Sequence, residues 1–539
     1  MNTPAQPPRR PPLLQFILPI LFLLAGIYIG QRASTHGHTF RLDASNDFSK
    51  LELVVQQIQD NYLDTVDVAE LIEGALPVIL EELDPHSVYI SAVDMPQANE
   101  SIEGNFDGIG VTFNMPNDTV VVMNVIAGGP SERVGIHPGD RIVTVDDSLI
   151  AGRQLDQNAI VRMLRGQRGT KVRLGIARPG EDQRLAITIV RDKIPVKSAD
   201  AAYMINGETG YIRLSKFSKT THTEFLAGID ALRSEGMTSL VLDLRGNGGG
   251  LLEQAFEIAN EFLDKGNLIV YTEGRVRPRH DYFATGTGRC RDIRLAILID
   301  ESSASASEIL AGAIQDNDRG LIVGRRSFGK GLVQEPVFFS DNSGLRLSVA
   351  RYYTPTGRSI QKPYSRNNRQ AYENELYDRY RHGEMSSSDS AKMSGEQFHT
   401  PQGKVVYGGG GIMPDVFVPI DTTGVNAYFL SVNRKNLVYL FALEFTDRHR
   451  ETLNEIQSFD KLNACFAAYR FDSLFRRYAA ERGVVATDAA WNECRLLIDT
   501  HLRAHIGRNT PLEDNAYYRT LASIDNTLAK ATEELGMGN

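Results

Sequence analysis

RLAILIDESSASASEILAGAI, residues 294–314, joins an apolar run, a cluster of small hydroxyl residues and a helical apolar pattern in direct succession. Residues 295–299 are typical of a buried strand, and residues 309–314 supply the apolar face of a helix after it. A strand that leads straight into a helix is the repeating unit of α/β proteins. The same alternation runs from about residue 210 to residue 419, which predicts an α/β core there.

The bulk composition limits the class of protein. At 539 residues the chain is too long for one compact core, because domains usually hold about 100–200 residues. Hydrophobic content of 42% and charged content of 23% are those of a soluble globular protein. A net charge of −9 without a long run of Lys and Arg gives no reason to expect nucleic acid as a partner.

The cysteines and histidines give no metal signature. The sequence contains no C-x-x-C pair and no H-E-x-x-H pair, so we expect neither a metal site nor a cofactor. A disulfide between Cys465 and Cys494 stays open.

The N-terminus contains an apolar stretch, residues 13–30, after Arg9 and Arg10. Its length suits a bilayer span, which needs roughly 17–25 residues. Positive charge before the span predicts that the residues before it lie in the cytoplasm. The rest of the chain would then be extracytoplasmic, in the cell envelope or periplasm. The exit sequence at residues 30–34 is a poor cleavage site, so we favour an uncleaved membrane anchor within residues 1–35 over a signal peptide.

Helical patterns flank the central part of the chain. Apolar residues recur at helical spacing between residues 51 and 62 and between 71 and 83, which predicts two helices in an N-terminal segment, residues 45–103. Residues 421–539 form a helix-rich C-terminal extension without evident chemistry, where a homo-oligomer or an adaptor contact could form. A polar insertion, residues 366–403, is expected to be mobile and to need no fold.

Residues 104–197 have the texture of a small β-rich module, in which two stretches resemble a PDZ domain: GIGV at 108–111 and GGPSERVGIHPGDRI at 128–142. Loop backbone N–H groups around Gly108, Ile109, Gly110 and Val111 could receive a peptide carboxylate, after which the peptide adds to the sheet edge. The other interpretation is a β-sandwich fragment with glycine turns.

Ser305 stands at the corner between the strand and helix quoted above. Backbone N–H groups at a helix N-terminus carry partial positive charge, so this corner can hold a nucleophile and stabilise an oxyanion. The alternative is that Ser303 or Ser305 only caps the helix.

Lys330 lies between two glycines before a predicted strand. A lysine has a pKa of about 10.4, so it must be buried to be neutral and act as a base at pH 7. Gln334 could hold its amine by a hydrogen bond. The alternatives are an exposed turn lysine and an ordinary strand glutamine.

A glycine-rich loop, residues 246–250, follows another buried strand and can donate a second N–H group. It has neither the Rossmann nor the P-loop register, and the chain has no G-x-S-x-G elbow. A distant histidine base for Ser305 stays open.

The chain is similar to the C-terminal processing peptidases, also called tail-specific proteases, from about residue 45 to residue 420. The resemblance rests on motifs that occur in one order: LDPHS at 83–87, the two PDZ stretches, DLR at 243–245, SASASE at 303–308, FGKG at 328–331, YYTP at 352–355 and GIMPDV at 411–416. It implies an α/β fold with a crotonase/ClpP-like peptidase core, residues 198–420, and an inserted PDZ domain, residues 104–197, that gates access.

The resemblance also implies site roles. Ser305 and Lys330 have the family's spacing of 25 positions and would be nucleophile and base, with Gln334 orienting the base. The backbone N–H groups of Ala306 and Gly249 would form the oxyanion hole. Two positions depart from the family: Ser302 replaces a common glycine and Gly248 a common proline, and neither removes a catalytic side chain.

Two function classes follow. The first is an extracytoplasmic, membrane-anchored serine endopeptidase that binds substrate polypeptides by their C-termini and cleaves them with a Ser–Lys dyad, without metal or cofactor. The second is a catalytically silent PDZ scaffold that recruits partner proteins. Acyl-thioester chemistry on the crotonase-like core is remote, because an outward-facing location has no evident coenzyme supply.

Overall fold

The computed structural model describes residues 24–25, 47–115, 118–126, 128–365, 369–387 and 395–537. The chain divides into two compact units, residues 1–76 and 77–539. Both predicted N-terminal helices are present, as α2 (Asp47–Asn61) and α3 (Val68–Glu81). Among the described residues, no helix is both long and apolar enough to cross a membrane. The predicted anchor, residues 13–30, lies outside the described residues except for Leu24 and Ala25.

A six-stranded sheet forms the centre of the second unit. Its strands lie in the order β10-β11-β12-β15-β16-β21, and all neighbours are parallel except β10 and β11. Parallel strands are usually covered on both faces, so their sequences are nearly continuous apolar runs. In agreement with this, every residue of β12 is buried. The predicted α/β core is therefore confirmed. The strands are β10 (Ala199–Met204), β11 (Thr209–Leu214), β12 (Ser239–Asp243), β15 (Arg294–Ile299), β16 (Leu321–Gly324) and β21 (Val416–Phe417).

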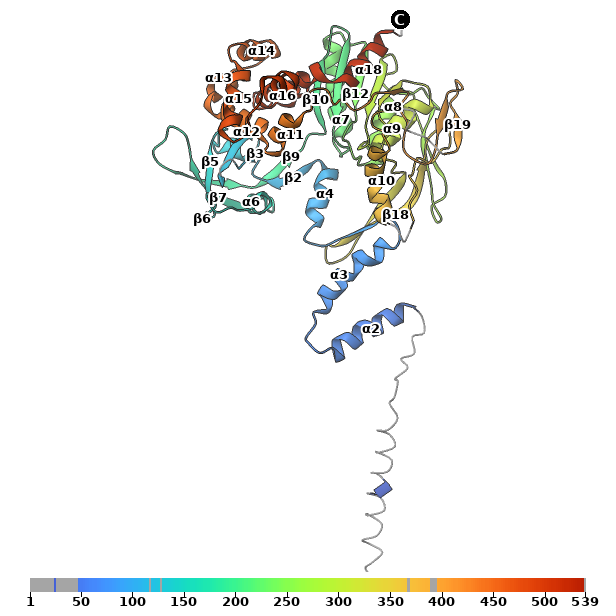
Figure 1. Cartoon of the computed structure of the whole chain (residues 1–539). Coiled ribbons are helices and arrows are strands. Elements are labelled where there is room, and N and C mark those ends of the chain that lie inside the picture. Colours follow the sequence, from blue (N-terminus) through green and yellow to red (C-terminus); the bar gives the residue numbers. More distant parts are fainter. Residues whose placement is uncertain are drawn as a thin grey trace, which may run out of the picture. The chain divides into compact units, whose positions relative to one another are not determined.

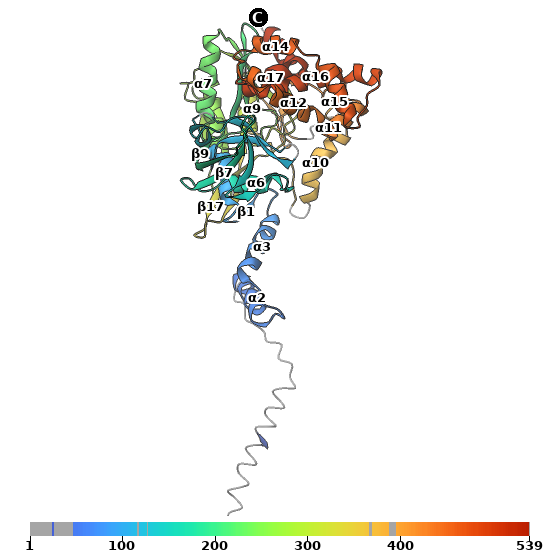
Figure 2. The ribbon, with the colours of Figure 1, turned by 90° about the vertical axis from the view of Figure 1, so that its left-hand side faces the viewer.

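Helices cover both faces of this sheet. One face packs against α7 (Thr221–Ser234), α8 (Leu252–Phe262) and α9 (Ala306–Asp316). The other face packs against α18 (Asn526–Met537), the last helix of the C-terminal extension. Figure 1 shows α18 beside β12, and Figure 2 shows α7 on the side away from the other C-terminal helices. The extension thus supplies one layer of the α/β core.

An antiparallel sheet stands beside the core and carries the segment after Lys330. Its strand order is β1-β18-β13-β14, with β17 also paired to β18. Lys330 lies two residues before β17, and Gln334 lies within that strand. The strands are β1 (Val88–Ile90), β13 (Leu268–Glu273), β14 (His280–Phe283), β17 (Leu332–Phe338) and β18 (Gly344–Tyr353).

The polar insertion is more ordered than the sequence predicts. We expected no fold between residues 366 and 403, but this stretch contains α10 (Arg369–Arg381) and β19 (Gln397–His399), which pairs with β20 (Val405–Tyr407). Arg379 of α10 is buried and donates to the carbonyl oxygens of Arg326 and Ser327. A charged helix is ordered here because its Arg379 satisfies backbone groups of the core.

The β-rich module has a sheet of order β3-β4-β5-β7-β8 and its own apolar core, as predicted. Strand β3 is an edge strand of this sheet, and β2 pairs separately with β9. The elements are α4 (Met95–Glu103), which leads into the module, and β2 (Asn105–Gly108), β3 (Val111–Asn114), β4 (Val120–Val125), α5 (Pro130–Arg133), β5 (Arg141–Val145), β6 (Ser148–Leu149), α6 (Gln157–Leu164), β7 (Lys171–Ala177), β8 (Leu185–Val190) and β9 (Asp192–Pro195).

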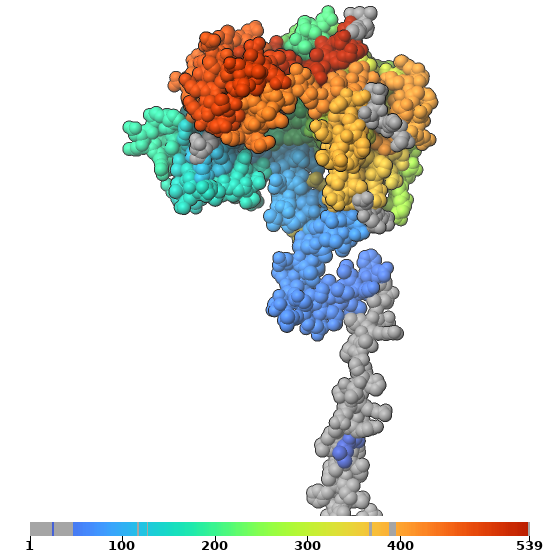
Figure 3. Space-filling model, in the orientation of Figure 1, coloured from blue at the N-terminus to red at the C-terminus, as the bar shows by residue number. Residues whose placement is uncertain are grey.

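The C-terminal extension is helical, as predicted, with a separate aromatic-rich core. It contacts the β-rich module: Leu443 packs on Val121 and Met123, and Arg141 pairs with Asp447 at 2.7 Å. Figure 3 shows the two surfaces meeting, orange on teal. Its helices are α11 (Ala427–Arg434), α12 (Leu437–Arg448), α13 (Arg450–Asn454), α14 (Phe459–Ala467), α15 (Phe471–Glu481), α16 (Asp488–Arg508), α17 (Glu513–Leu521), η3 (Ala522–Ile524) and α18.

All three cysteines are free thiols, so the disulfide left open between Cys465 and Cys494 is not formed.

Candidate active site

Ser305 is the N-cap residue of α9, at the end of the short loop that follows β15. Its φ of 56° lies in the left-handed region, a conformation that costs a residue with a side chain about 1–3 kcal/mol and is frequent at active sites. Ser303 and Ser307 are fully buried, and their Oγ atoms donate to the carbonyl oxygens of Leu244 and Asn247. Ser305 is partly exposed. Of these three serines, it is the one that a substrate can reach.

Glu308 fixes the backbone on both sides of this corner. Its Oε2 accepts the N–H groups of Ser305 at 2.8 Å and of Lys330 at 2.9 Å. Its Oε1 accepts the Ser327 hydroxyl at 2.6 Å and the Gly329 N–H at 2.7 Å. Burial raises the pKa of Glu308 to about 7, although these four donors lower it. One buried carboxyl group therefore joins the serine corner to the lysine segment.

Tyr352 makes a second bridge between the same two segments. Its hydroxyl oxygen lies within hydrogen-bond distance of the carbonyl oxygens of Ser305, at 3.1 Å, and of Lys330. Tyr352 lies on β18 and is 1% exposed. Glu308 thus holds the backbone N–H groups of Ser305 and Lys330, and Tyr352 contacts their backbone C=O groups.

Lys330 is partly buried and its amine has a specific partner. Burial lowers its pKa, the positive charge of Arg346 lowers it further, and Asp84 and Glu308 act in the opposite direction. Lys330 Nζ donates to Gln334 Oε1 at 2.8 Å, and Gln334 Nε2 donates to the carbonyl oxygen of His86. Lys330 is thus not an exposed turn lysine, and Gln334 contacts its amine as expected.

The hydrogen bonds of the described residues include none between Ser305 Oγ and Lys330 Nζ. The amine is bound to Gln334 in this arrangement. A proton transfer between these two groups would need a side-chain rotation that brings Nζ and Oγ together.

The LDPHS turn supports the lysine side of the site. Asp84 accepts the N–H groups of His86 and Ser87 at 2.8 Å each and the Ser87 hydroxyl at 2.6 Å. His86 Nε2 lies 2.6 Å from the hydroxyl of Tyr372 on α10. Burial, and then the charge of Lys330, lower the pKa of His86 to about 4, so its imidazole is neutral at pH 7.

Sequence reasoning gave no role to His86, Glu308 or Tyr352. All three lie inside motifs that carry the family resemblance, which is the signal that could have drawn attention to them.

The glycine loop borders Ser305. A Cβ atom added to Gly249 would lie 2.8 Å from Ser305 Cβ and 3.0 Å from Ala306 N. The Gly249 N–H, however, donates to Asn247 Oδ1 at 2.9 Å, so it is occupied in this arrangement. Ala306 begins α9, where the first N–H groups have no partner within the helix. The structure therefore brings both predicted oxyanion residues to Ser305, with the Gly249 N–H engaged elsewhere.

The predicted peptide-binding residues lie in the β-rich module. Gly108 ends β2, Val111 begins β3, and Gly110 between them has a φ of 77°. The Ile109 carbonyl oxygen accepts the N–H and the hydroxyl of Ser131, which fixes the loop. β3 is an edge strand, so on its outer side it has no strand neighbour among the described residues.

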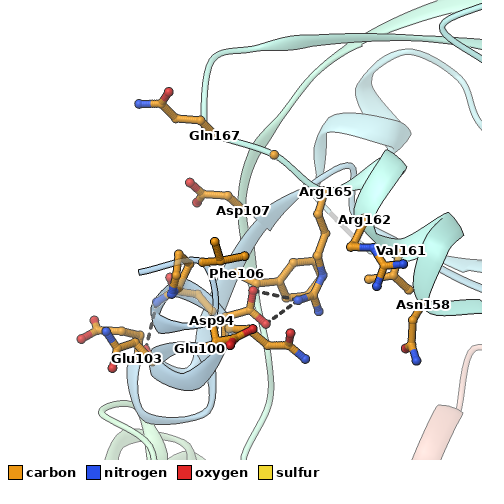
Figure 4. Close-up of a pocket in the computed structure, with 16 residues that line it drawn as sticks. Asp94, Glu100, Glu103, Phe106, Asp107, Asn158, Val161, Arg162, Arg165 and Gln167 are labelled. Carbon is orange, nitrogen blue, oxygen red and sulfur yellow. Dashed lines mark hydrogen bonds and ion pairs between the residues drawn. The ribbon is translucent and has the colours of Figure 1, made fainter. Parts of the chain in front are cut away.

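A separate cleft of about 940 Å³ lies where α4 and β2 meet α6 and the loop after it. Figure 4 shows Arg165, the residue after α6, reaching Glu100 on α4. Its Nη1 lies 2.8 Å and 2.6 Å from the two carboxylate oxygens, and the guanidinium lies 4.4 Å from the ring centre of Phe106. This contact ties the β-rich module to the helix before it.

Four families match parts of the sequence. Residues 208–366 match Peptidase family S41, and residues 108–189 match the PDZ domain. Residues 29–93 match the activating protease CtpB N-terminal domain, and residues 428–510 match a family of unknown function, DUF8443.

Several proteins of known class are similar to this chain. A carboxy-terminal-processing protease of Bartonella bacilliformis is 37% identical over 351 residues, which cover 64% of this chain and 80% of that protein. A probable CtpA-like serine protease of Staphylococcus aureus is 34% identical over 346 residues, covering 64% and 68%. The solved photosystem II D1 C-terminal processing protease aligns over 70% of this chain and 87% of its own, with 24% identity and a TM-score of 0.36. The chain belongs to the carboxy-terminal-processing serine proteases of peptidase family S41 and carries their PDZ domain.

Proposed function

We propose that this serine peptidase is an endopeptidase in which Ser305 is the nucleophile and Lys330 the general base. The observation that carries the proposal is the shared Glu308 carboxyl group, which holds the Ser305 corner and the Lys330 segment together. The lowered pKa of Lys330 supports it, because only the neutral amine has a lone pair that can accept the serine proton.

The reaction follows from these positions. Lys330 Nζ leaves Gln334 and accepts the Ser305 hydroxyl proton while Oγ attacks the scissile carbonyl carbon. The developing oxyanion receives the Ala306 N–H at the start of α9. As the C–N bond breaks, the Lys330 ammonium returns a proton to the leaving amine, and an acyl group stays on Ser305. Neutral Lys330 then takes a proton from water, which attacks the ester carbonyl carbon. As the bond between this carbon and Ser305 Oγ breaks, the Lys330 ammonium returns the proton to Oγ, and the new C-terminus is released.

Gln334 orients the base between proton transfers. Its Oε1 accepts from the lysine amine, and its Nε2 is held by the carbonyl oxygen of His86. A pKa lowered to about 4 makes the His86 imidazole a weak base, and its Nε2 is engaged with Tyr372. We therefore assign the base to Lys330 and not to His86.

The PDZ domain would bind the substrate's C-terminus. Strand β3 has an open edge, to which an extended peptide can add, and the loop from Gly108 to Val111 lies at the end of this edge. The partners in this proposal are extracytoplasmic polypeptides with free C-termini. The apolar stretch at residues 13–30 would act as the membrane anchor that holds the enzyme in the cell envelope.

The test follows cleavage of an unfolded polypeptide with an apolar C-terminus by the full-length chain and by Ser305→Ala, Lys330→Ala and Ser302→Ala. Ser302 is an exposed neighbour in the same serine run and serves as the matched control. We expect cleavage by the parent and by Ser302→Ala and none by the other two. Equal rates in all four would refute the dyad. A folded parent that binds the polypeptide without cutting it would favour a PDZ scaffold.

A second substrate with a C-terminal amide tests recognition. The amide removes the carboxylate while it keeps the sequence, so KM should rise if the PDZ loop binds the terminus. An unchanged KM would mean that the substrate enters by another route.

A further inference from the structure

A buried cluster of charges lies at the end of β12, where the glycine loop begins. Asp243 is fully buried and pairs with two guanidinium groups, Arg213 at 3.1 Å and Arg245 at 2.7 Å. Asp200 lies 3.9 Å from Arg213, and burial raises the pKa of its carboxyl group. The side chains of Arg213 and Arg245 are 16% and 19% exposed, and Asp243 alone cannot balance two largely buried cations, because an unpaired buried charge is strongly unfavourable.

The missing carboxylate comes from the C-terminal extension. Asp525, between η3 and α18, accepts Arg245 Nη1 at 3.0 Å and Nη2 at 2.6 Å, in a two-point contact. The same carboxylate accepts the Leu528 N–H at 3.0 Å and so caps α18. A planar guanidinium held at two points has a fixed orientation as well as a fixed position.

Arg245 is joined to the nucleophile corner through the residues that follow it. The Gly246 N–H donates to Asp300, the residue after β15, at 2.9 Å. The Asn247 carbonyl oxygen accepts the Ala304 N–H at 3.0 Å, and the next glycines bring Gly249 against Ser305. The chain of contacts therefore runs from Asp525 through Arg245 and the glycine loop to Ser305.

We propose that Asp525 is a positioning residue for the peptidase site: it fixes Arg245 and thereby the glycine loop against Ser305. This role rests on the proposed function of Ser305. It gives the C-terminal extension a part in catalysis, in addition to its packing on the core sheet through α18.

The test compares Asp525→Asn, Asp525→Glu and the control Asp488→Asn in the full-length chain. Asp488 also lies at a helix start in the extension, but its side chain is 86% exposed, and among the described residues its ion-pair partner is Arg476. Three experiments are made: steady-state kinetics, which give kcat and KM for the unfolded polypeptide, amide hydrogen exchange of residues 245–250, and thermal unfolding, which gives the melting temperature.

We expect Asp525→Asn to lower kcat by about 10- to 100-fold with KM nearly unchanged, as a small misplacement of reacting groups does. Exchange at residues 245–250 should become faster. Asp525→Glu keeps the charge and should recover part of kcat. Asp488→Asn should match the parent in kcat and in the exchange of residues 245–250.

The proposal fails if Asp525→Asn exchanges and cuts like Asp488→Asn, or if its lower activity only follows a smaller folded fraction. If Asp525→Asn does not fold, the proposal is tested with folded Asp525→Glu, by kcat and by the hydrogen exchange of residues 245–250. If Asp525→Asn speeds exchange in the glycine loop but cleavage does not depend on Ser305, the coupling of Asp525 to the loop is supported and the proposed function is refuted. Ser305-dependent cleavage with unchanged exchange and kcat would refute the coupling alone.

Discussion

Ser305 and Lys330 donate their backbone N–H groups to the same atom, Oε2 of Glu308, at 2.8 Å and 2.9 Å. The two residues are 25 positions apart in the sequence: Ser305 is the N-cap of α9, and Lys330 lies two residues before β17 of the antiparallel sheet. One buried side chain at the start of α9 therefore helps to set their spacing in space, together with the Tyr352 hydroxyl, which contacts both carbonyl oxygens. Any change that moves this carboxyl group should move both residues together.

Glu308→Gln should reduce both activity and stability. The amide keeps one acceptor oxygen but turns a donor toward the Ser327 and Gly329 side of the site, where the Gly329 N–H would lose its partner. An unsatisfied buried polar group costs about 1–3 kcal/mol. Urea unfolding and kcat measure the two effects, with Glu253→Gln on the exposed side of α8 as control. Parent-like values for both quantities would contradict the role given to Glu308.

The stability of the parent should also depend on pH through Glu308. Burial raises the pKa of this group to about 7 in the folded protein, above its usual value of 4.5. The folded state then binds the proton more tightly than the unfolded state, so the stabilisation is complete below about pH 4.5 and is lost as pH rises to about 7. The loss should approach about 3 kcal/mol. Subtracting the unfolding curves of Glu308→Gln isolates this dependence, and a difference that stays flat with pH would refute it.

Gly249→Ala should abolish cleavage. The added methyl group would meet the Ala304 carbonyl oxygen at 2.7 Å and Ser305 Cβ at 2.8 Å, and the residue has a φ of 99°. Gly248 is the matched control, because a Cβ atom there would have nothing within 4 Å. We expect Gly248→Ala to stay within about threefold of the parent in kcat/KM, since surface changes away from special features are usually small. Equal activity of the two alanine variants would mean that the loop does not border the reacting groups.

Arg346→Gln should move the pH dependence of cleavage toward higher pH. After burial, the charge of Arg346 is the main cause that lowers the pKa of Lys330. Without it the amine keeps its proton to higher pH, so activity falls at neutral pH and approaches the parent value at high pH. Arg351→Gln, an exposed arginine on the same strand, is the control. A loss that is equal at every pH would point to a structural defect instead, since Arg346 also donates to the Ala98 carbonyl oxygen.

The α/β core, the β-rich module and the helical extension could be predicted because each has a local pattern. Residues 295–299 form a continuous apolar run, which predicts a buried strand from these residues alone. In the structure they belong to β15. The position of Ser305 at the strand-to-helix corner follows from the same stretch. These features depend on neighbours in the sequence.

The partners of these residues could not be predicted, because they depend on contacts between distant segments. Nothing in the sequence near Asp525 indicates that it pairs with Arg245, 280 positions earlier. The insertion was expected to have no fold because its composition is polar. It is ordered because Arg379 and Arg326 share Glu384 in a buried ion-pair network.

Tyr372→Phe tests whether the insertion supports the site. The Tyr372 hydroxyl lies 2.6 Å from His86 Nε2, and the His86 carbonyl oxygen holds Gln334, the partner of Lys330. Removing the hydroxyl loses a hydrogen bond worth about 0.5–1.5 kcal/mol and frees the His86 ring to turn. Because the lysine amine is held through this chain, we expect kcat to fall by about three- to tenfold while KM stays constant.

The control for this change lies on the same helix. Tyr377 is 62% exposed, so Tyr377→Phe alters α10 without a contact to the LDPHS turn. If both phenylalanine variants lower kcat equally, the effect belongs to the helix as a whole. If only Tyr372→Phe does, and Gln334→Ala removes any further effect of the Tyr372 change, the two residues act on Lys330 through one path. Additive effects would instead mean that Tyr372 acts independently of Gln334.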